Sequence, residues 1–213
     1  DQAILRLQEE RYPLVVVDRS FKHLTTDYVM ADNFGGALRA AQHLIALGHQ
    51  RIGFLTSAEP AVTMEHRELG YRQALVEAGL VANPDDTWSI ECYPTMDMTP
   101  LVPVLSAAQG PTAILAASDR LALALYKLCR TLRLHIPEDL AIVGFGDFGI
   151  SAHLDPALTS VALPTFEIGR KAAEVVMGRI DGSIAGPQQH MLPTNLIVRA
   201  SCGTKASDQA PEE

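Results

Sequence analysis

The chain has 213 residues, of which 47% are hydrophobic and 20% are charged, and its formal net charge at neutral pH is −8. A chain of this length buries roughly 70% of its unfolded surface, so it can form one large domain or two lobes without disulfides or structural metals. The negative charge repels a phosphate backbone, which argues against direct DNA binding by this stretch. No apolar run reaches about 18 residues, so we expect no membrane-spanning helix.

The three cysteines are Cys92, Cys129 and Cys202. They are odd in number and widely spaced, which fits neither a zinc-binding pattern nor a disulfide framework. We expect free thiols, as in a cytoplasmic protein. The first residues, DQAILRLQEERYP, are typical of the end of a helix, so we expect the chain to be a fragment of a longer protein.

Strands and helices alternate along the chain. Short apolar runs predict strands at 13–18, 28–32, 51–56, 87–93, 112–118, 140–145 and 158–163, and a closing extended segment at 190–201. Helical periodicity predicts helices at 34–47, 63–78, 101–108, 119–132 and 165–181. This alternation predicts an α/β fold with doubly wound parallel sheets.

The stretch GFGDFG at 144–149 matches G-x-G-x-x-G, the dinucleotide-binding fingerprint, but its surroundings do not. That fingerprint opens a long helix, and an acidic residue follows on the next strand. Here Pro156 interrupts the following segment, and the strand at 158–163 ends without an acid. We therefore predict no bound cofactor and interpret the glycines as a sharp turn at a strand end.

Catalytic and metal-binding patterns are also missing from the sequence. It contains no P-loop, no G-x-S-x-G elbow and no H-E-x-x-H motif. His43 and His49 lie six residues apart, so they do not share one helix face as a pair of metal ligands would. We predict neither catalysis nor a metal site.

Short polar residues follow the predicted strands, at the edge where open parallel sheets bind ligands. They are Asp18, Asp32, Thr56, Ser57, Tyr93, Ser118, Asp119, Gly146 and Asp147, and Arg67 lies early in a following helix. Carboxylates and arginine bind hydroxyl groups and an aromatic ring stacks on a sugar ring, so the set suits a small polyhydroxylated ligand. The alternative is structural: Asp32 and Asp119 can be helix caps, and Asp18 can simply end a strand.

The chain also contains, in this order, the segments DNFGGALRAAQHLIALGHQRIGFLT, RELGYRQALVEAGL, PTAILAASDRLALALYKL, IPEDLAIVGFGDF, DPALTSVALP and LPTNLIVRASC. In order and spacing they resemble the effector-binding core of LacI–GalR family transcription regulators, over residues 14–202. The resemblance implies a periplasmic-binding-protein-like core of two α/β lobes joined by three crossovers, with an effector in the cleft between them. It assigns 32–160 and 193–201 to the C-terminal effector-binding lobe, 1–31 and 161–192 to an incomplete N-terminal lobe, and 202–213 to a flexible tail.

The same resemblance implies effector contacts. Asp18 matches an acid at the end of the strand before the lobe crossover. Arg67, within R-x-x-G-Y, matches an arginine that holds effector hydroxyls or a carboxylate. Tyr93 lies near an aromatic platform position. These three residues are therefore expected to contact the effector.

Two positions depart from the family pattern. Ser118 stands where the family usually has Asn before Asp119. Gly146 replaces the first acid of the usual G-F-D-D, and Asp147 keeps the second. Either Asp147 reaches the effector, or the effector differs from a typical neutral sugar. We expect Ser118, Gly146 and Asp147 to line the site, and we expect Gly146 to enlarge it.

The resemblance implies a ligand sensor that changes the affinity of a dimeric, cytoplasmic regulator for operator DNA. The DNA would be bound by a helix-turn-helix head that this chain lacks. Two alternatives stay open: a solute-binding protein of a sugar transporter, which shares the fold, and an enzyme on a doubly wound sheet. The helix at 165–181 should expose apolar surface, be mobile or pair with another chain, because its partners would lie largely in the missing part of the N-terminal lobe.

Overall fold

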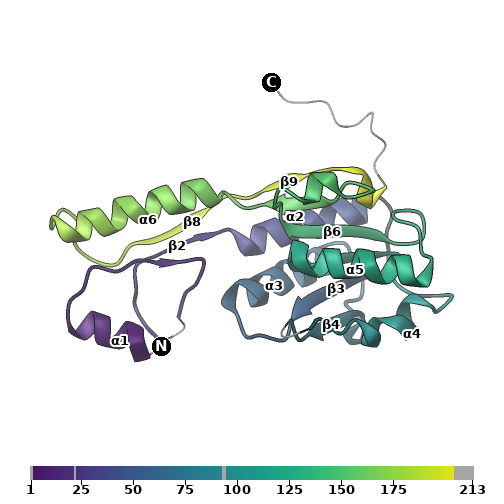
Figure 1. The fold of residues 1–213 in the computed structure, drawn as a ribbon, viewed down its shortest axis with the longest axis horizontal. Coiled ribbons are helices and arrows are strands. Elements are labelled where there is room, and N and C mark those ends of the chain that lie inside the picture. Colours follow the sequence, from purple (N-terminus) through teal and green to yellow (C-terminus); the bar gives the residue numbers. More distant parts are fainter. Residues whose placement is uncertain (1, 22, 93–94, 204–213) are drawn as a thin grey trace, which may run out of the picture.

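A computed structural model describes residues 2–21, 23–92 and 95–203. These residues form two parts, each with its own sheet: a small part on the left of Figure 1 and a large part on the right. The described chain passes between the parts three times, from β2 to α2, from β7 to α6 and from β8 to β9. The predicted α/β fold with parallel sheets is confirmed.

The large part is a six-stranded sheet in the order β4-β3-β5-β6-β7-β9. Its strands are β3 (Ile52–Ser57), β4 (Thr87–Ile90), β5 (Ala113–Ala116), β6 (Ala141–Gly146), β7 (Thr159–Ala162) and β9 (Asn195–Ile197). Its helices are α2 (Asn33–Ala46), α3 (Val62–Glu77), α4 (Val102–Leu105) and α5 (Asp119–Leu132). All paired strands are parallel except β7 and β9. The central strands β3, β5 and β6 are apolar and buried along almost their whole length, as expected where helices cover both faces of a sheet.

The small part is a three-stranded parallel sheet in the order β1-β2-β8. Its elements are α1 (Gln2–Glu9), β1 (Val16–Val17), β2 (Tyr28–Ala31), α6 (Thr165–Ile180) and β8 (Gln189–Leu192). Ile168 and Ala172 of α6 pack on Val29 and Ala31 of β2 and form a separate small core.

Helix α6 also carries apolar side chains that no described residue covers. Phe166, Met177 and Ile180 are exposed on it. The predicted exposure of this helix is confirmed for these side chains, whereas its other apolar face packs on the small sheet. No helix in the described ranges is long and apolar enough to span a membrane.

Three predicted boundaries need correction. The division between 160 and 161 falls inside β7, whose four residues all pair with β6, so the chain leaves the large sheet only after Ala162. The segment 190–201 is not one strand: β8 and β9 belong to different sheets, and Pro193 lies between them. The tail does not begin at Cys202, because this residue is buried in a short 3-10 turn; residues 204–213 lie outside the described ranges.

Candidate functional site

A buried arginine lies where the two parts of the molecule meet. Arg67 of α3 is only 4% exposed. Its Nε donates to Oδ1 of Asn33 at 2.8 Å, its Nη1 donates to the carbonyl oxygen of Ala117 at 2.6 Å, and its Cζ lies 3.9 Å from the centre of the Phe145 ring. Among the described residues, no side chain or carbonyl accepts a hydrogen bond from the third nitrogen, Nη2. The guanidinium is therefore held rigidly with one donor group left over.

The charge of Arg67 is only partly balanced. Burial lowers the pKa of Arg67 to about 10, and the attraction of Asp18 and Asp119 opposes that effect. The guanidinium is thus still protonated at neutral pH. A buried cation with an unused donor is a binding group for hydroxyl or carboxylate oxygens.

Asp18 belongs to the small part, and its charge acts on this arginine. It directly follows β1 and has a left-handed backbone conformation, with φ of 51°. The residue is exposed, but protein atoms crowd its carboxyl group, and this burial raises the pKa of Asp18 against the opposing effects of Arg67 and of a hydrogen bond with Asn33. The carboxyl group therefore interacts with Asn33 and with the charge of Arg67, while the residue as a whole is exposed to solvent.

Asn33 connects the two charged groups. It is completely buried at the first position of α2, and its Nδ2 also donates to the carbonyl oxygen of Ala31 at 2.9 Å. The cap itself is Asp32, whose Oδ1 accepts from the backbone N–H of Gly35 at 2.8 Å. The structural interpretation of Asp32 is thus confirmed. A polar side chain directly after the crossover was the only sequence feature that pointed to Asn33.

Ser118, and not Asp119 as the local sequence suggested, is the residue that caps α5. Ser118 is the N-cap of α5, and its Oγ accepts from the N–H of Leu121 at 3.3 Å. Asp119 is therefore not the cap. It is 1% exposed and accepts three hydrogen bonds, from Oγ of Ser160 at 2.6 Å, Oγ of Ser151 at 2.7 Å and the N–H of Phe148 at 3.0 Å.

Asp147 does not reach out of the sheet edge. Its carboxylate pairs with Arg199, with 2.6 Å between Oδ1 and Nη1, and both side chains are largely buried. Its backbone N–H donates to Oγ of Ser160 at 3.1 Å. The second acid of the family pattern is thus occupied by an internal ion pair in this structure.

Gly146 does not open an empty space. It has φ of +134°, a conformation that residues with a side chain rarely adopt. A Cβ added there would lie 2.8 Å from Cε2 of Phe148, so the ring of Phe148 occupies the space beside the glycine. The expected enlargement of the pocket is therefore not found at this position. Tyr93 lies outside the described residues.

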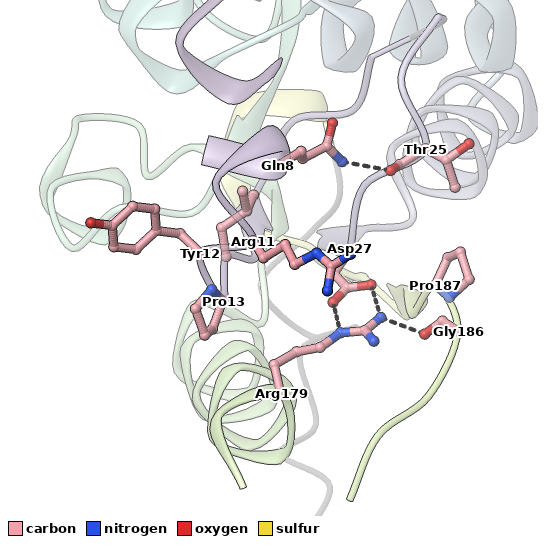
Figure 2. Close-up of a pocket in the computed structure, with 10 residues that line it drawn as sticks. Gln8, Arg11, Tyr12, Pro13, Thr25, Asp27, Arg179, Gly186 and Pro187 are labelled. Carbon is pink, nitrogen blue, oxygen red and sulfur yellow. Dashed lines mark hydrogen bonds and ion pairs between the residues drawn. The ribbon is translucent and has the colours of Figure 1, made fainter. Parts of the chain in front are cut away.

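A hollow lies in the small part and has a volume of about 400 Å³ (Figure 2). At its base Asp27 accepts two hydrogen bonds from Arg179, at 2.6 and 2.8 Å. Arg179 donates further to the carbonyl oxygens of Ile184 and Gly186, and Gln8 donates to that of Thr25. Because these polar groups satisfy one another, we place the candidate site at the strand ends around Arg67 and not here.

The residue types at the strand ends suit a polar organic ligand rather than a metal. Among the described residues, no group of three His, Cys, Asp or Glu side chains could hold a metal ion. The acids Asp119 and Asp147 are already used by internal donors. Asp18, on which the charge of Arg67 acts, and Nη2 of Arg67 remain as the candidate acceptor and donor of the site.

Residues 41–202 match the family model of the periplasmic binding protein-like domain. This chain belongs to that family. The LacI-family regulator CelR of Thermobifida fusca is 36% identical over 180 residues, which are 82% of this chain and 51% of the relative. The ribose operon repressor of Haemophilus influenzae is 30% identical over 191 residues, 89% of this chain and 57% of the relative. The chain thus spans about half the length of these relatives and corresponds to their LacI-family effector-binding core, as the resemblance implied.

Solved structures of LacI-family regulators agree with this core. A complex of the regulator CelR with cellobiose superposes with a TM-score of 0.87 and 32% identity, over 94% of this chain and 62% of that one. A LacI-family regulator from Enterococcus faecium with bound ribose gives a TM-score of 0.83 and 27% identity, over 94% and 74% of the two chains. Both structures contain a sugar.

Proposed function

We propose that this chain is the ligand-sensing core of a LacI-type transcriptional regulator and binds a sugar-like effector. The effector would lie at the carboxyl ends of the strands of the large sheet, between the two parts of the molecule. Asp18 and Arg67 would bind its hydroxyl groups. Ser118, whose hydroxyl hydrogen has no described acceptor, would donate from the end of β5.

One observation carries this proposal: the chain of contacts Asp18–Asn33–Arg67. It starts at β1 in the small part, passes through the first residue of the crossover helix α2 and ends on α3 in the large part. A ligand that bridges Asp18 and Nη2 of Arg67 would therefore hold the two parts in one relative orientation. Binding of a ligand at this position would therefore depend on the relative orientation of the two parts.

The proposed mechanism is a shift between two orientations of the lobes. An effector that binds one orientation more tightly raises its population. In a homodimer, that change would alter the spacing of the two DNA-binding heads, and linkage requires that operator binding in turn alters effector affinity. The chain itself is acidic, so operator DNA would be bound by a helix-turn-helix head elsewhere in the intact protein.

The remaining parts of the proposal follow from the relatives. They are transcriptional regulators and repressors, which favours gene regulation over sugar transport and over catalysis. We accordingly propose a cytoplasmic, non-enzymatic protein. For the lobes, we propose that the part up to β2 together with α6 and β8 moves as one body, and that α2 to β7 with β9 moves as the other.

The test is a thermal-shift titration of the intact protein with cellobiose, ribose, glucose, galactose and lactose. A sugar that binds only the folded state adds roughly 2.7 kcal/mol of stability at a concentration of 100 times its Kd. We expect at least one sugar to raise the melting temperature. Arg67→Met should weaken its binding roughly 10- to 100-fold, because a hydrogen bond to a charged group contributes about 1.5–3 kcal/mol.

Arg72→Met is the matched control. Arg72 lies on the same helix but pairs with Glu68 at the surface, 2.7 Å away. Its replacement should leave sugar affinity unchanged. The proposal is wrong if no sugar of this set shifts the melting temperature, or if folded Arg67→Met and Arg72→Met bind the sugar equally well.

A further inference from the structure

A solvent-exposed aromatic ring lies at the carboxyl end of β6. Phe148 is 55% exposed, although it follows one of the most deeply buried strands of the molecule. One face of its ring lies against Gly146, where an added Cβ would be 2.8 to 3.2 Å from three ring atoms. The backbone of Gly146 at φ +134° and the absence of its side chain both allow this close approach. The other side of the ring is left to solvent.

Backbone hydrogen bonds to buried side chains fix the loop that carries this ring. The backbone N–H of Phe148 donates to the buried carboxylate of Asp119, which also accepts from Ser151 further along the same loop. The preceding N–H, of Asp147, donates to Ser160 of β7, which in turn donates to Asp119. An exposed aromatic ring is thus anchored through its backbone to a buried hydrogen-bond network. Such an arrangement costs little further entropy when the ring binds a partner.

The ring lies on the same edge of the sheet as the arginine of the proposed site. Nη1 of Arg67 donates to Ala117 at the end of β5, and Phe148 follows the end of the neighbouring strand β6. The charge of Asp119, which holds Phe148, also acts on Arg67. Arg67 itself stacks on Phe145 in β6. Phe148 and Arg67 are therefore linked through Asp119 and the neighbouring strand ends β5 and β6.

We propose that Phe148 is the stacking platform for the effector and determines its specificity: the C–H face of a sugar ring would lie on the exposed side of the phenyl ring. This inference rests on the proposed function and adds to it. At this strand end the chain offers an apolar surface and no free carboxylate, since Asp147 is paired with Arg199. The site should prefer ligands that present a continuous C–H face toward β6. It should disfavour ligands that present a hydroxyl group there, because that hydroxyl group would need a free carboxylate as its hydrogen-bond acceptor.

The experiment uses tryptophan as a reporter. The one tryptophan of this 213-residue chain, Trp88, is buried in β4. Phe148→Trp in the intact protein retains an aromatic platform, and we expect its emission to change as the best sugar of the thermal-shift set is added. Phe148→Ala should weaken the binding of the same sugar roughly 5- to 50-fold. Its melting temperature without ligand should stay within about 2 °C of that of the parent, since exposed side chains contribute little to stability.

Leu69 provides the matched control, because it is also 55% exposed and lies on α3, the helix that carries Arg67. Leu69→Trp should show no sugar-dependent emission, and Leu69→Ala should bind as the parent does. The platform role is refuted if Phe148→Ala keeps full affinity while Arg67→Met loses it, an outcome that leaves the proposed function intact. It is also refuted if Phe148→Trp emits as a buried tryptophan without sugar and does not respond to it, because the ring is then covered by another part of the protein. If no sugar binds the parent protein, both proposals fail together.

Discussion

Replacement of Asp119 by alanine tests whether one buried carboxylate holds the end of β6 in place. The change leaves three donors without their acceptor: the hydroxyls of Ser151 and Ser160 and the N–H of Phe148. The bonds from the two serines are buried, where water cannot replace the lost oxygens without a rearrangement of the loop, and the bond from Phe148 is partly buried. Relief of the cost of burying the carboxylate offsets part of the loss.

The expected loss of stability follows from these contacts. Each donor that loses its acceptor costs about 1–3 kcal/mol, and relief of the carboxylate's desolvation offsets part of the sum, so we expect a net loss of about 3–5 kcal/mol. For a chain of this size each 1 kcal/mol lowers the melting temperature by roughly 2–4 °C, so Asp119→Ala should melt roughly 6–20 °C below the parent. Asp119→Asn keeps one acceptor oxygen, so its melting temperature should lie between those of Asp119→Ala and the parent.

Thermal denaturation followed by far-ultraviolet circular dichroism measures this loss. Asp85→Ala is the control, because Asp85 is exposed in the turn before β4, and such surface changes stay within about 0.5 kcal/mol. A double-mutant cycle adds specificity: Ser151→Ala should destabilise the parent but have little further effect in Asp119→Ala. A melting temperature of Asp119→Ala within 2 °C of the parent, or equal effects of Ser151→Ala in both backgrounds, would refute the reasoning.

Gly70→Ala places a methyl group against the backbone of α2 and should lower the free energy of unfolding by roughly 1–3 kcal/mol. Gly169→Ala, which has open space at a helical position, should raise that free energy by about 0.5–1 kcal/mol. Urea denaturation of both variants compares the two effects. Although burial alone would raise it, the ion pair with Arg179 (Figure 2) and a hydrogen bond from the backbone N–H of Gln188 hold the pKa of Asp27 below its usual 3.8. Its contribution to stability is therefore present above pH 4 and lost as the pH falls below that value, so the parent and Asp27→Asn should differ near neutrality and converge in acid; a constant difference across that range would contradict the pairing. Burial raises the pKa of Cys129 to about 11, so iodoacetamide at pH 8 should label the partly exposed Cys92 first and Cys129 only after unfolding, as peptide mass spectrometry would record.

Local pattern predicted most of the secondary structure. Apolar runs marked the central strands β3, β5 and β6, because a strand covered on both faces needs apolar residues at every position. Helical spacing located α2, α3, α5 and α6, and their alternation with strands fixed the parallel fold class. The cap at Asp32 was also predictable, since its partner is three residues away.

Predictions failed where the deciding partner is far away in the sequence. Asp119 was assigned as a cap from its position, but its partners lie 29 to 41 residues downstream. Asp147 was a candidate ligand group until the fold brought Arg199, 52 residues away, against its carboxylate. No local pattern encodes such pairs, because they form only when separate strands come together at one edge of the sheet.

The sequence by itself determined that this protein is an α/β core of the LacI family with polar residues at its strand ends. Tertiary structure alone decided which of those residues are still available to a ligand. Arg67 keeps an unused donor because Asn33 and Ala117 occupy its other nitrogens, and the space beside Gly146 is filled because the loop after β6 folds Phe148 back onto it. A side chain's type follows from the sequence, but its free hydrogen-bonding capacity depends on what the fold has already paired with it.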